Sequence, residues 1–177
     1  MSRNDRRLVA KGIGKALDAH PCGPCRECCT VMGVSEIGKA QGEPCPKMRV
    51  APNTGPIAGG CSVYKTRPAS CAEYNCIFRL GLLDKIAGFA TGDAGRPDKL
   101  GLFFDLNETK ATGIQMITVR EIREGAMESN MELLHTLAGQ GHVLYLIDGE
   151  RRRMMGPEER VRAVQLAAKR SLPLVSR

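Results

Sequence analysis

Residues 22–29 of the chain read CGPCRECC, a C-x-x-C-x-x-C-C run that holds four of the eight cysteines. Two thiolates separated by two residues in a tight turn can converge on one metal ion, so C-x-x-C recurs in zinc knuckles and iron–sulfur loops. Gly23 and Pro24 suit such a turn. The run therefore predicts a metal site rather than four separately buried cysteines.

The remaining four cysteines follow shortly after this run and complete a set of predicted metal ligands. The set is Cys22, Cys25, Cys28, Cys29, Cys45, Cys61, Cys71 and Cys76. Cys28 and Cys29 are adjacent, and two neighbouring side chains rarely reach one tetrahedral ion without strain. We therefore expect them to serve different metal ions, or different irons of one cluster. Eight thiolates then divide into two four-ligand sets, whose membership the sequence leaves open.

The cysteine segment is poor in residues that could build a core. Residues 20–80 contain all eight cysteines and seven of the ten prolines. A segment with so few regularly spaced apolar residues needs bound metal ions or another cross-link, a staple, in order to fold. We therefore expect three parts: a basic N-terminal segment at 1–19, a loop-rich, metal-stapled cysteine module at 20–80, and an α/β region at 81–177 that packs on it.

Residues 100–177 show regular secondary-structure patterns and contain no cysteine. Apolar, β-branched runs predict strands at 102–106, 114–122 and 143–147, and Asp148-Gly149 predicts a tight turn that leads to a fourth strand ending at 154–155. Helices are expected from about Asn130 and from Pro157. This order predicts an α+β fold with a small β-β-α-β-β-α region of sheet and helices.

The first of these helices carries a specific N-terminal pattern. Ser129 and Glu132 match a capping box. Apolar residues spaced for one helix face predict that Met131, Leu134 and Ala138 point toward the core.

Charge and signals bear on location and partners. No secretory signal or bilayer-length apolar stretch is present in the sequence, so we expect a cytoplasmic protein without membrane contact. In a reducing compartment, dense cysteines indicate metal binding or catalysis rather than disulfides. The net charge of +7 makes nucleic acid an alternative partner. Thiolate charge would remove more than half of that excess, so nucleic acid is not favoured.

The cysteine segment resembles the YkgJ-type cysteine-cluster family of zinc- or iron-chelating domains. The resemblance rests on the C-x-x-C-x-x-C-C run, on Cys45-Pro46, and on GGCSVYKTRPASCAEYNC at residues 59–76. It covers residues 22–76, and Ala72 and Tyr74 depart from the Arg and Phe of the family pattern. The resemblance implies metal chelation and does not imply a reaction.

Cysteine-only ligation suits both zinc and iron. Two closed four-thiolate zinc sites would be structural, whereas C-x-x-C-x-x-C followed by a distant Cys-Pro is similar to the ligand pattern of bacterial ferredoxins. The cofactor is therefore zinc or iron, with an iron–sulfur cluster as one form of the latter. Arg67 and Tyr64 are candidate partners of the thiolates, while His20, His135 and His142 are expected to be structural or exposed.

Catalytic patterns were absent from the sequence: it contains no phosphate-binding loop and no nucleophile elbow. We therefore expect a metal-binding protein without catalytic residues rather than an enzyme. Two alternatives stay open. One is an iron–sulfur redox or modifying enzyme, and the other is a nucleic-acid-binding zinc module, for which the basic run Arg151–Arg153 is the motivation.

Overall fold

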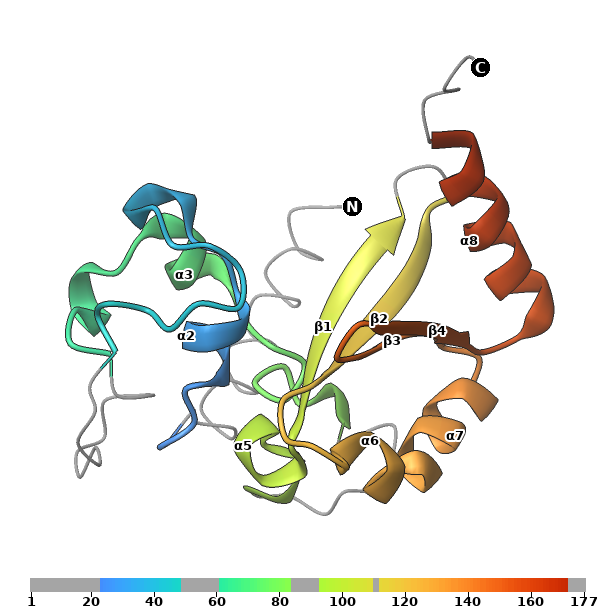
Figure 1. Cartoon of the computed structure of the whole chain (residues 1–177), viewed down its shortest axis with the longest axis horizontal. Coiled ribbons are helices and arrows are strands. Elements are labelled where there is room, and N and C mark those ends of the chain that lie inside the picture. The colour runs from blue at the N-terminus through green and yellow to red at the C-terminus, as the bar shows by residue number, and fades with distance from the viewer. Residues whose placement is uncertain (1–22, 49–60, 84–92, 110–111, 172–177) are drawn as a thin grey trace, which may run out of the picture.

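A computed structural model describes residues 23–48, 61–83, 93–109 and 112–171 of the chain. The cysteine-bearing segments lie to one side of a sheet that is flanked by helices (Figure 1). The predicted N-terminal segment 1–19, His20 and Cys22 lie outside the described residues.

The sheet has four strands in the order β1-β2-β3-β4. They are β1 (Leu102–Thr109), β2 (Ile114–Glu121), β3 (Val143–Asp148) and β4 (Arg151–Met155). β1 and β2 are antiparallel, β2 and β3 are parallel, and β3 and β4 are antiparallel. A parallel pair needs a long connection, which is supplied by α6 (Ala126–Ser129) and α7 (Met131–Gly139), and α8 (Glu158–Ser171) follows β4. The predicted α+β class and the β-β-α-β-β-α order are confirmed.

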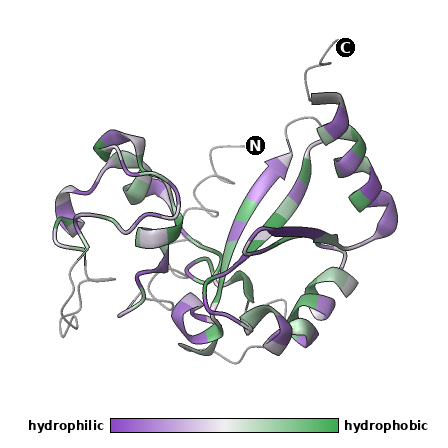
Figure 2. Cartoon of the chain, in the orientation of Figure 1, coloured by the Kyte–Doolittle hydropathy of each residue, from purple (hydrophilic) through white to green (hydrophobic). Residues whose placement is uncertain are grey.

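β1 is longer than its apolar stretch predicts. It starts with buried residues and continues through the exposed Leu106, Asn107 and Glu108 to Thr109, and Figure 2 shows this change from hydrophobic to hydrophilic along the strand. The pairing with β2 runs without interruption from Leu102 opposite Glu121 to Thr109 opposite Ile114. Because the backbone ladder continues, the strand continues after its apolar residues end.

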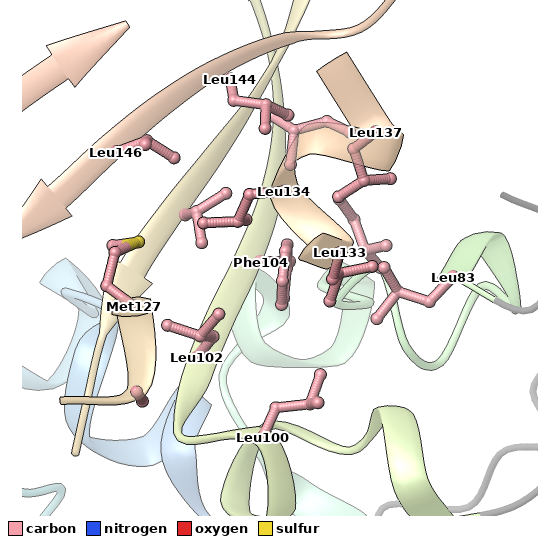
Figure 3. Close-up of a cluster of buried hydrophobic side chains, with 14 residues drawn as sticks. Leu83, Leu100, Leu102, Phe104, Met127, Leu133, Leu134, Leu137, Leu144 and Leu146 are labelled. Atoms are coloured by element: carbon pink, nitrogen blue, oxygen red, sulfur yellow. The ribbon is translucent and has the colours of Figure 1, made fainter. Parts of the chain in front are cut away.

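The core lies between one face of the sheet and helices α6 and α7. Leu102, Phe104 and Val119 on the strands are almost fully buried against Leu134 and Leu137 of α7 (Figure 3). Side chains alternate between the two faces of a strand, and each of β1, β2 and β3 contributes two alternating residues to this cluster: Leu102 and Phe104, Ile117 and Val119, and Leu144 and Leu146.

The helix after β2 differs from its predicted form. It starts earlier, as α6, and is interrupted at Asn130, whose side-chain amide donates to the carbonyls of Ala126 at 2.7 Å and Leu100 at 3.2 Å. Ser129 ends α6 instead of capping α7, and its hydroxyl donates to the carbonyl of Gly125. The predicted capping box is therefore wrong, because a preceding helical turn occupies the position of the cap.

The predicted inward face of that helix is only partly right. Leu134 is fully buried, as expected, but its buried companions are Leu133 and Leu137. Met131 and Ala138 are partly buried and pack at the margin of the cluster. The helix is rotated relative to the prediction, because leucine side chains fill the space over the sheet better than Ala138 does.

The opposite face of the sheet is covered at one end by α8. A surface cavity there is lined by Met116, Tyr145 and Met154 of the sheet and by Val164 of the helix. These three sheet residues alternate with those of the core, as the pleat requires. Within the described residues α8 is the longest helix, with 14 residues; it falls short of the about 20 apolar residues that span a bilayer, and no other described helix qualifies.

The cysteine-bearing segments contain only short helices. They are α2 (Glu27–Val31), the 3-10 turns η1 (Ser35–Ile37) and η3 (Tyr64–Thr66), and α3 (Ala69–Glu73). Before β1, the 3-10 turn η4 (Asp93–Gly95) and α5 (Pro97–Leu100) follow.

Tyr74 and Ile77 join the described cysteine segments to the sheet. The ring of Tyr74 stacks on that of Phe103 in β1, with centroids 6.3 Å apart. Ile77 is 1% exposed and belongs to the same core cluster as the sheet. The core therefore reaches back across the predicted domain boundary at residue 80.

We expect Gly156→Ala to destabilise the fold by about 1–3 kcal/mol. Gly156 follows β4 with a φ of +145°, and a Cβ atom there would lie 2.6 Å from the carbonyl oxygen of His142. Urea unfolding would measure the loss. Gly139→Ala is the control, because a Cβ at Gly139 meets open space, and alanine favours the helix over glycine. Equal effects of both substitutions would contradict this account.

Candidate metal centre

Six cysteines line one cavity, which we call the cysteine cavity. Its volume is about 110 Å³. The six are Cys28, Cys29, Cys45, Cys61, Cys71 and Cys76. They come from separate segments of the chain, so the fold brings together thiols that lie far apart in the sequence. No disulfide joins any two of the seven described cysteines.

Short local structures hold these cysteines in place. Cys28 and Cys29 are both on α2, and the amide of Cys45 donates to the carbonyl of Cys29 at 2.9 Å. Cys61 pairs with Met48 in an isolated β-bridge, and Cys71 is on α3.

The amino end of α3 is tied to η1 by Glu36. The Glu36 carboxylate accepts hydrogen bonds from the Ser70 amide at 3.0 Å and from the Ser70 hydroxyl at 2.9 Å. Because Ser70 directly precedes Cys71, this contact fixes the position of the Cys71 backbone at the cavity wall.

Cys25 is placed differently from the six. It is 9% exposed and is not among the residues that line the cysteine cavity. Burial raises the pKa of its thiol to about 12, against the opposing effect of the backbone amides of Glu27 and Asp98. Because the Asp98 amide belongs to α5, the side chain of Cys25 lies toward that helix. Cys28 and Cys29, which are neighbours in the chain, both line the cysteine cavity.

Two cavity thiols have shifted pKa values. A hydrogen bond with Cys28 lowers the pKa of Cys29 to about 7, and the charges of Lys39 and Arg26 act in the same direction. Burial raises the pKa of Cys71, and the negative charges of Cys45 and Cys29 raise it further. Cys45 and Cys29 are therefore near enough to Cys71 for their negative charges to act on it.

Basic side chains accompany the thiols. Lys39, Lys47, Arg67 and Arg79 line the cysteine cavity, and none of the described lining residues is acidic or a histidine. The guanidinium carbon of Arg67 lies 4.2 Å from the centroid of the Tyr64 ring. Arg67 lines the cavity, whereas Tyr64 does not line it and contacts Arg67 through a cation–π interaction. A contact of either residue with the thiolates stays a prediction.

Tyr74 connects the cavity to the sheet. It lines the cavity, and its hydroxyl donates to Asp105 of β1 at 3.3 Å. Burial raises the pKa of the Asp105 carboxyl, and the hydrogen bond from Tyr74 partly opposes that rise. Burial and the charge of Asp105 also raise the pKa of Tyr74, so the tyrosine stays protonated as the donor.

We expect Asp105→Asn to increase the free energy of unfolding at neutral pH. A carboxyl whose pKa is raised by folding binds more protons in the folded than in the unfolded state, so its contribution to stability falls as pH rises through the folded pKa. Asparagine keeps an acceptor for Tyr74 without the buried charge. The advantage of the variant should shrink as pH is lowered into the range where carboxyl groups titrate.

Denaturant unfolding at several pH values would measure this difference. Glu108→Gln is the matched control, because Glu108 is exposed on the same strand, and its effect should be small throughout. A variant that is less stable than the wild type at neutral pH, or a difference independent of pH, would contradict the assignment.

In the described part of the chain, the cavity thiols are not arranged as a complete set of metal ligands. Within the described ranges, no group of three or more Cys, His, Asp or Glu side chains is arranged so that it could hold a metal ion. The cavity gathers the sulfur atoms around one space, and a bound ion would have to draw them inward from their present positions.

The other predicted residues lie away from this cavity. His135 is exposed on α7 and His142 precedes β3, and neither lines it. Arg151, Arg152 and Arg153 are exposed on β4. Arg151 pairs with Asp148 at 3.1 Å, and the Arg152 guanidinium donates to the carbonyl of Gly149 at 2.7 Å.

Several lining residues were not anticipated from the sequence, among them Lys39 and Tyr74. Tyr74 is held there by contacts with Phe103 and Asp105 far along the chain, whereas the side chain of Lys39 bonds to carbonyls of the nearby residues 30, 32 and 40. Comparison with known proteins gives no further guidance, since no family model matches the chain and neither a curated protein nor a solved structure is significantly similar to it.

Proposed function

We propose that this chain is a metal-binding protein that chelates zinc or iron through its clustered cysteines. The observation that supports this most strongly is the convergence of six cysteines on one cavity. Buried structural cysteines have no reason to share a cavity wall, whereas metal ligands must do so. The composition of the wall also favours soft, thiophilic metals, which thiolates bind in preference to hard cations.

The rest of the cavity wall suits a metal–thiolate centre. Met32, Val34, Ile37, Val63 and Pro68 contribute apolar surface, and an apolar shell limits the access of water to a metal site. The basic side chains offset the negative charge that several thiolates bring. A reducing, cytoplasmic location would keep the cysteines available as thiolate ligands.

The protein would act as a carrier or store of the metal, or would use it as a structural staple, without a reaction of its own. Cys25 stays part of the proposal as a predicted ligand that does not line the cavity, and Cys22, which lies outside the described residues, also stays a predicted ligand. Six thiolates can bind one ion with four ligands and leave two thiols unligated. They can also bind two ions if some of the sulfurs bridge both.

The decisive experiment is elemental analysis together with a visible spectrum on full-length protein purified without oxygen. Bound zinc in a colourless sample, or bound iron in a coloured one, would support the proposal and choose between the metals. Iron together with acid-labile sulfide would favour the iron–sulfur alternative. Reduced, folded protein that contains no metal and takes up neither zinc nor iron would overturn the proposal.

The nucleic-acid alternative needs a separate test. Binding that depends on Arg151–Arg153 should weaken steeply as salt concentration rises, because it releases counterions. Absence of RNA and DNA binding at low salt would remove this alternative.

A further inference from the structure

Lys39 has an unusual environment for a lysine. Its side chain lines the cysteine cavity, although the residue is only 6% exposed. Its ammonium donates hydrogen bonds to the carbonyls of Thr30 at 3.1 Å and Ala40 at 3.2 Å, and to that of Met32. Since an ammonium has three donors, these carbonyls use all of them.

These hydrogen bonds join two stretches of chain beside the ligand-bearing helix. Thr30 and Met32 lie at the end of α2, directly after Cys28 and Cys29, and Lys39 is paired with Val34 in an isolated bridge. The Lys39 side chain therefore fastens the loop after η1 to the helix that carries two of the cavity thiols.

Hydrogen bonding alone leaves the charge of Lys39 uncompensated. Carbonyl groups are dipoles without net charge, and burial of an ammonium is costly unless an anion lies near it. Among the described residues, no carboxylate forms an ion pair with Lys39. The same cavity wall holds six cysteines, which become anions when they ligate a metal, and the charge of Lys39 acts on Cys29 among them.

The metal centre would provide the matching negative charge whichever metal it holds. A divalent ion bound by four thiolates remains negatively charged, and so does an iron–sulfur cluster with four cysteine ligands. A permanent positive charge beside the sulfurs therefore stabilises the loaded centre in either case.

We propose that Lys39 is a positioning residue that supplies the counter-charge of the metal–thiolate centre and fixes the helix bearing Cys28 and Cys29. This inference rests on the proposed function. The positive charge is the essential property, and the hydrogen bonds to the carbonyls orient it.

Three substitutions separate charge from hydrogen bonding. Lys39→Arg keeps the charge, Lys39→Gln keeps a donor but loses the charge, and Lys39→Met keeps only the apolar stem. Full-length protein is titrated anaerobically with Co²⁺ as the probe, in competition with a chelator. We expect the Gln and Met variants to bind Co²⁺ about 10- to 100-fold more weakly and the Arg variant to stay near the wild type.

A spectroscopic measurement separates charge from a purely structural role. At saturating Co²⁺, loss of the positive charge raises the energy of the sulfur lone pairs, so the sulfur-to-cobalt absorption band should move to longer wavelength in the Gln and Met variants. The Arg variant should keep the wild-type band. Lys47→Met is the control: Lys47 lines the same cavity but is exposed, and solvent and salt screen its charge.

The outcomes distinguish the two levels of the proposal. Wild-type protein that binds no Co²⁺ overturns the proposed function itself. Wild-type binding together with an unshifted band and undiminished affinity in Lys39→Gln overturns only the role of Lys39. Loss of affinity in Lys39→Arg as large as in Lys39→Met would show that the geometry of the lysine, rather than its charge, is what matters.

Discussion

Replacing Cys71 by serine is expected to weaken metal binding by roughly 100- to 1,000-fold. Structural zinc sites with four ligands bind with about 10–16 kcal/mol, so one ligand accounts for roughly a quarter of that free energy. Cys71 is on α3 in the cavity wall, next to Cys45 and Cys29. Serine is nearly the same size but is a poor ligand for a thiophilic metal. Competition with a chelator under anaerobic conditions would measure the loss.

Cys25→Ser is the matched control for this prediction. Cys25 is buried outside the cavity, so its replacement should leave the number of bound ions unchanged if the cavity alone holds the metal. Equal losses in both variants would instead support ligation by the larger predicted set that includes Cys25. Unchanged metal content in Cys71→Ser would mean that the cavity is not the metal centre.

Phe104→Ala should destabilise the folded chain by about 3–5 kcal/mol. Phe104 is 1% exposed in the middle of the core, among Leu102, Leu133 and Leu134 (Figure 3). Removal of the ring leaves a cavity that neighbouring side chains from both sheet and helix cannot fill. Thermal or denaturant unfolding would measure the effect.

The control for Phe104→Ala is Leu106→Ala, two residues further along the same strand and on the same face. Leu106 is 41% exposed, because the helices that cover Phe104 do not reach it. Its truncation should change the free energy of unfolding by a small fraction of the Phe104 effect. Comparable losses would show that the core extends further along β1 than the burial pattern indicates.

The sheet could be predicted well from the sequence because its signals are local. β1, β2 and β3 each have a β-branched or apolar run. The fourth strand is marked by the two-residue loop after Asp148, which contains Gly149 with a φ of +54°. The errors arose where longer-range packing decides. The break at Asn130 depends on its hydrogen bond to the carbonyl of Leu100, which no pattern within the helix could reveal.

The candidate centre was predictable in composition but not in arrangement. Spacing identified the cysteines, yet it could not separate Cys25 from Cys28 and Cys29, because the helical turn that directs them apart begins only at Glu27. Tyr74 reaches the cavity through contacts with residues distant in the chain, and the hydrogen bonds that place Lys39 there follow no pattern that the sequence displays. Whether metal staples this segment stays a prediction.

Cys76 and Ile77 are neighbours in the chain, yet the first lines the cysteine cavity and the second is buried in the core of the sheet. Their Cα atoms are held about 3.8 Å apart by the peptide bond. Melting of the sheet must therefore displace one wall of the cavity. If the cavity holds an ion, heating should release the ion at the temperature at which the sheet unfolds. Protein made in cells short of that metal would then have a lower free energy of unfolding.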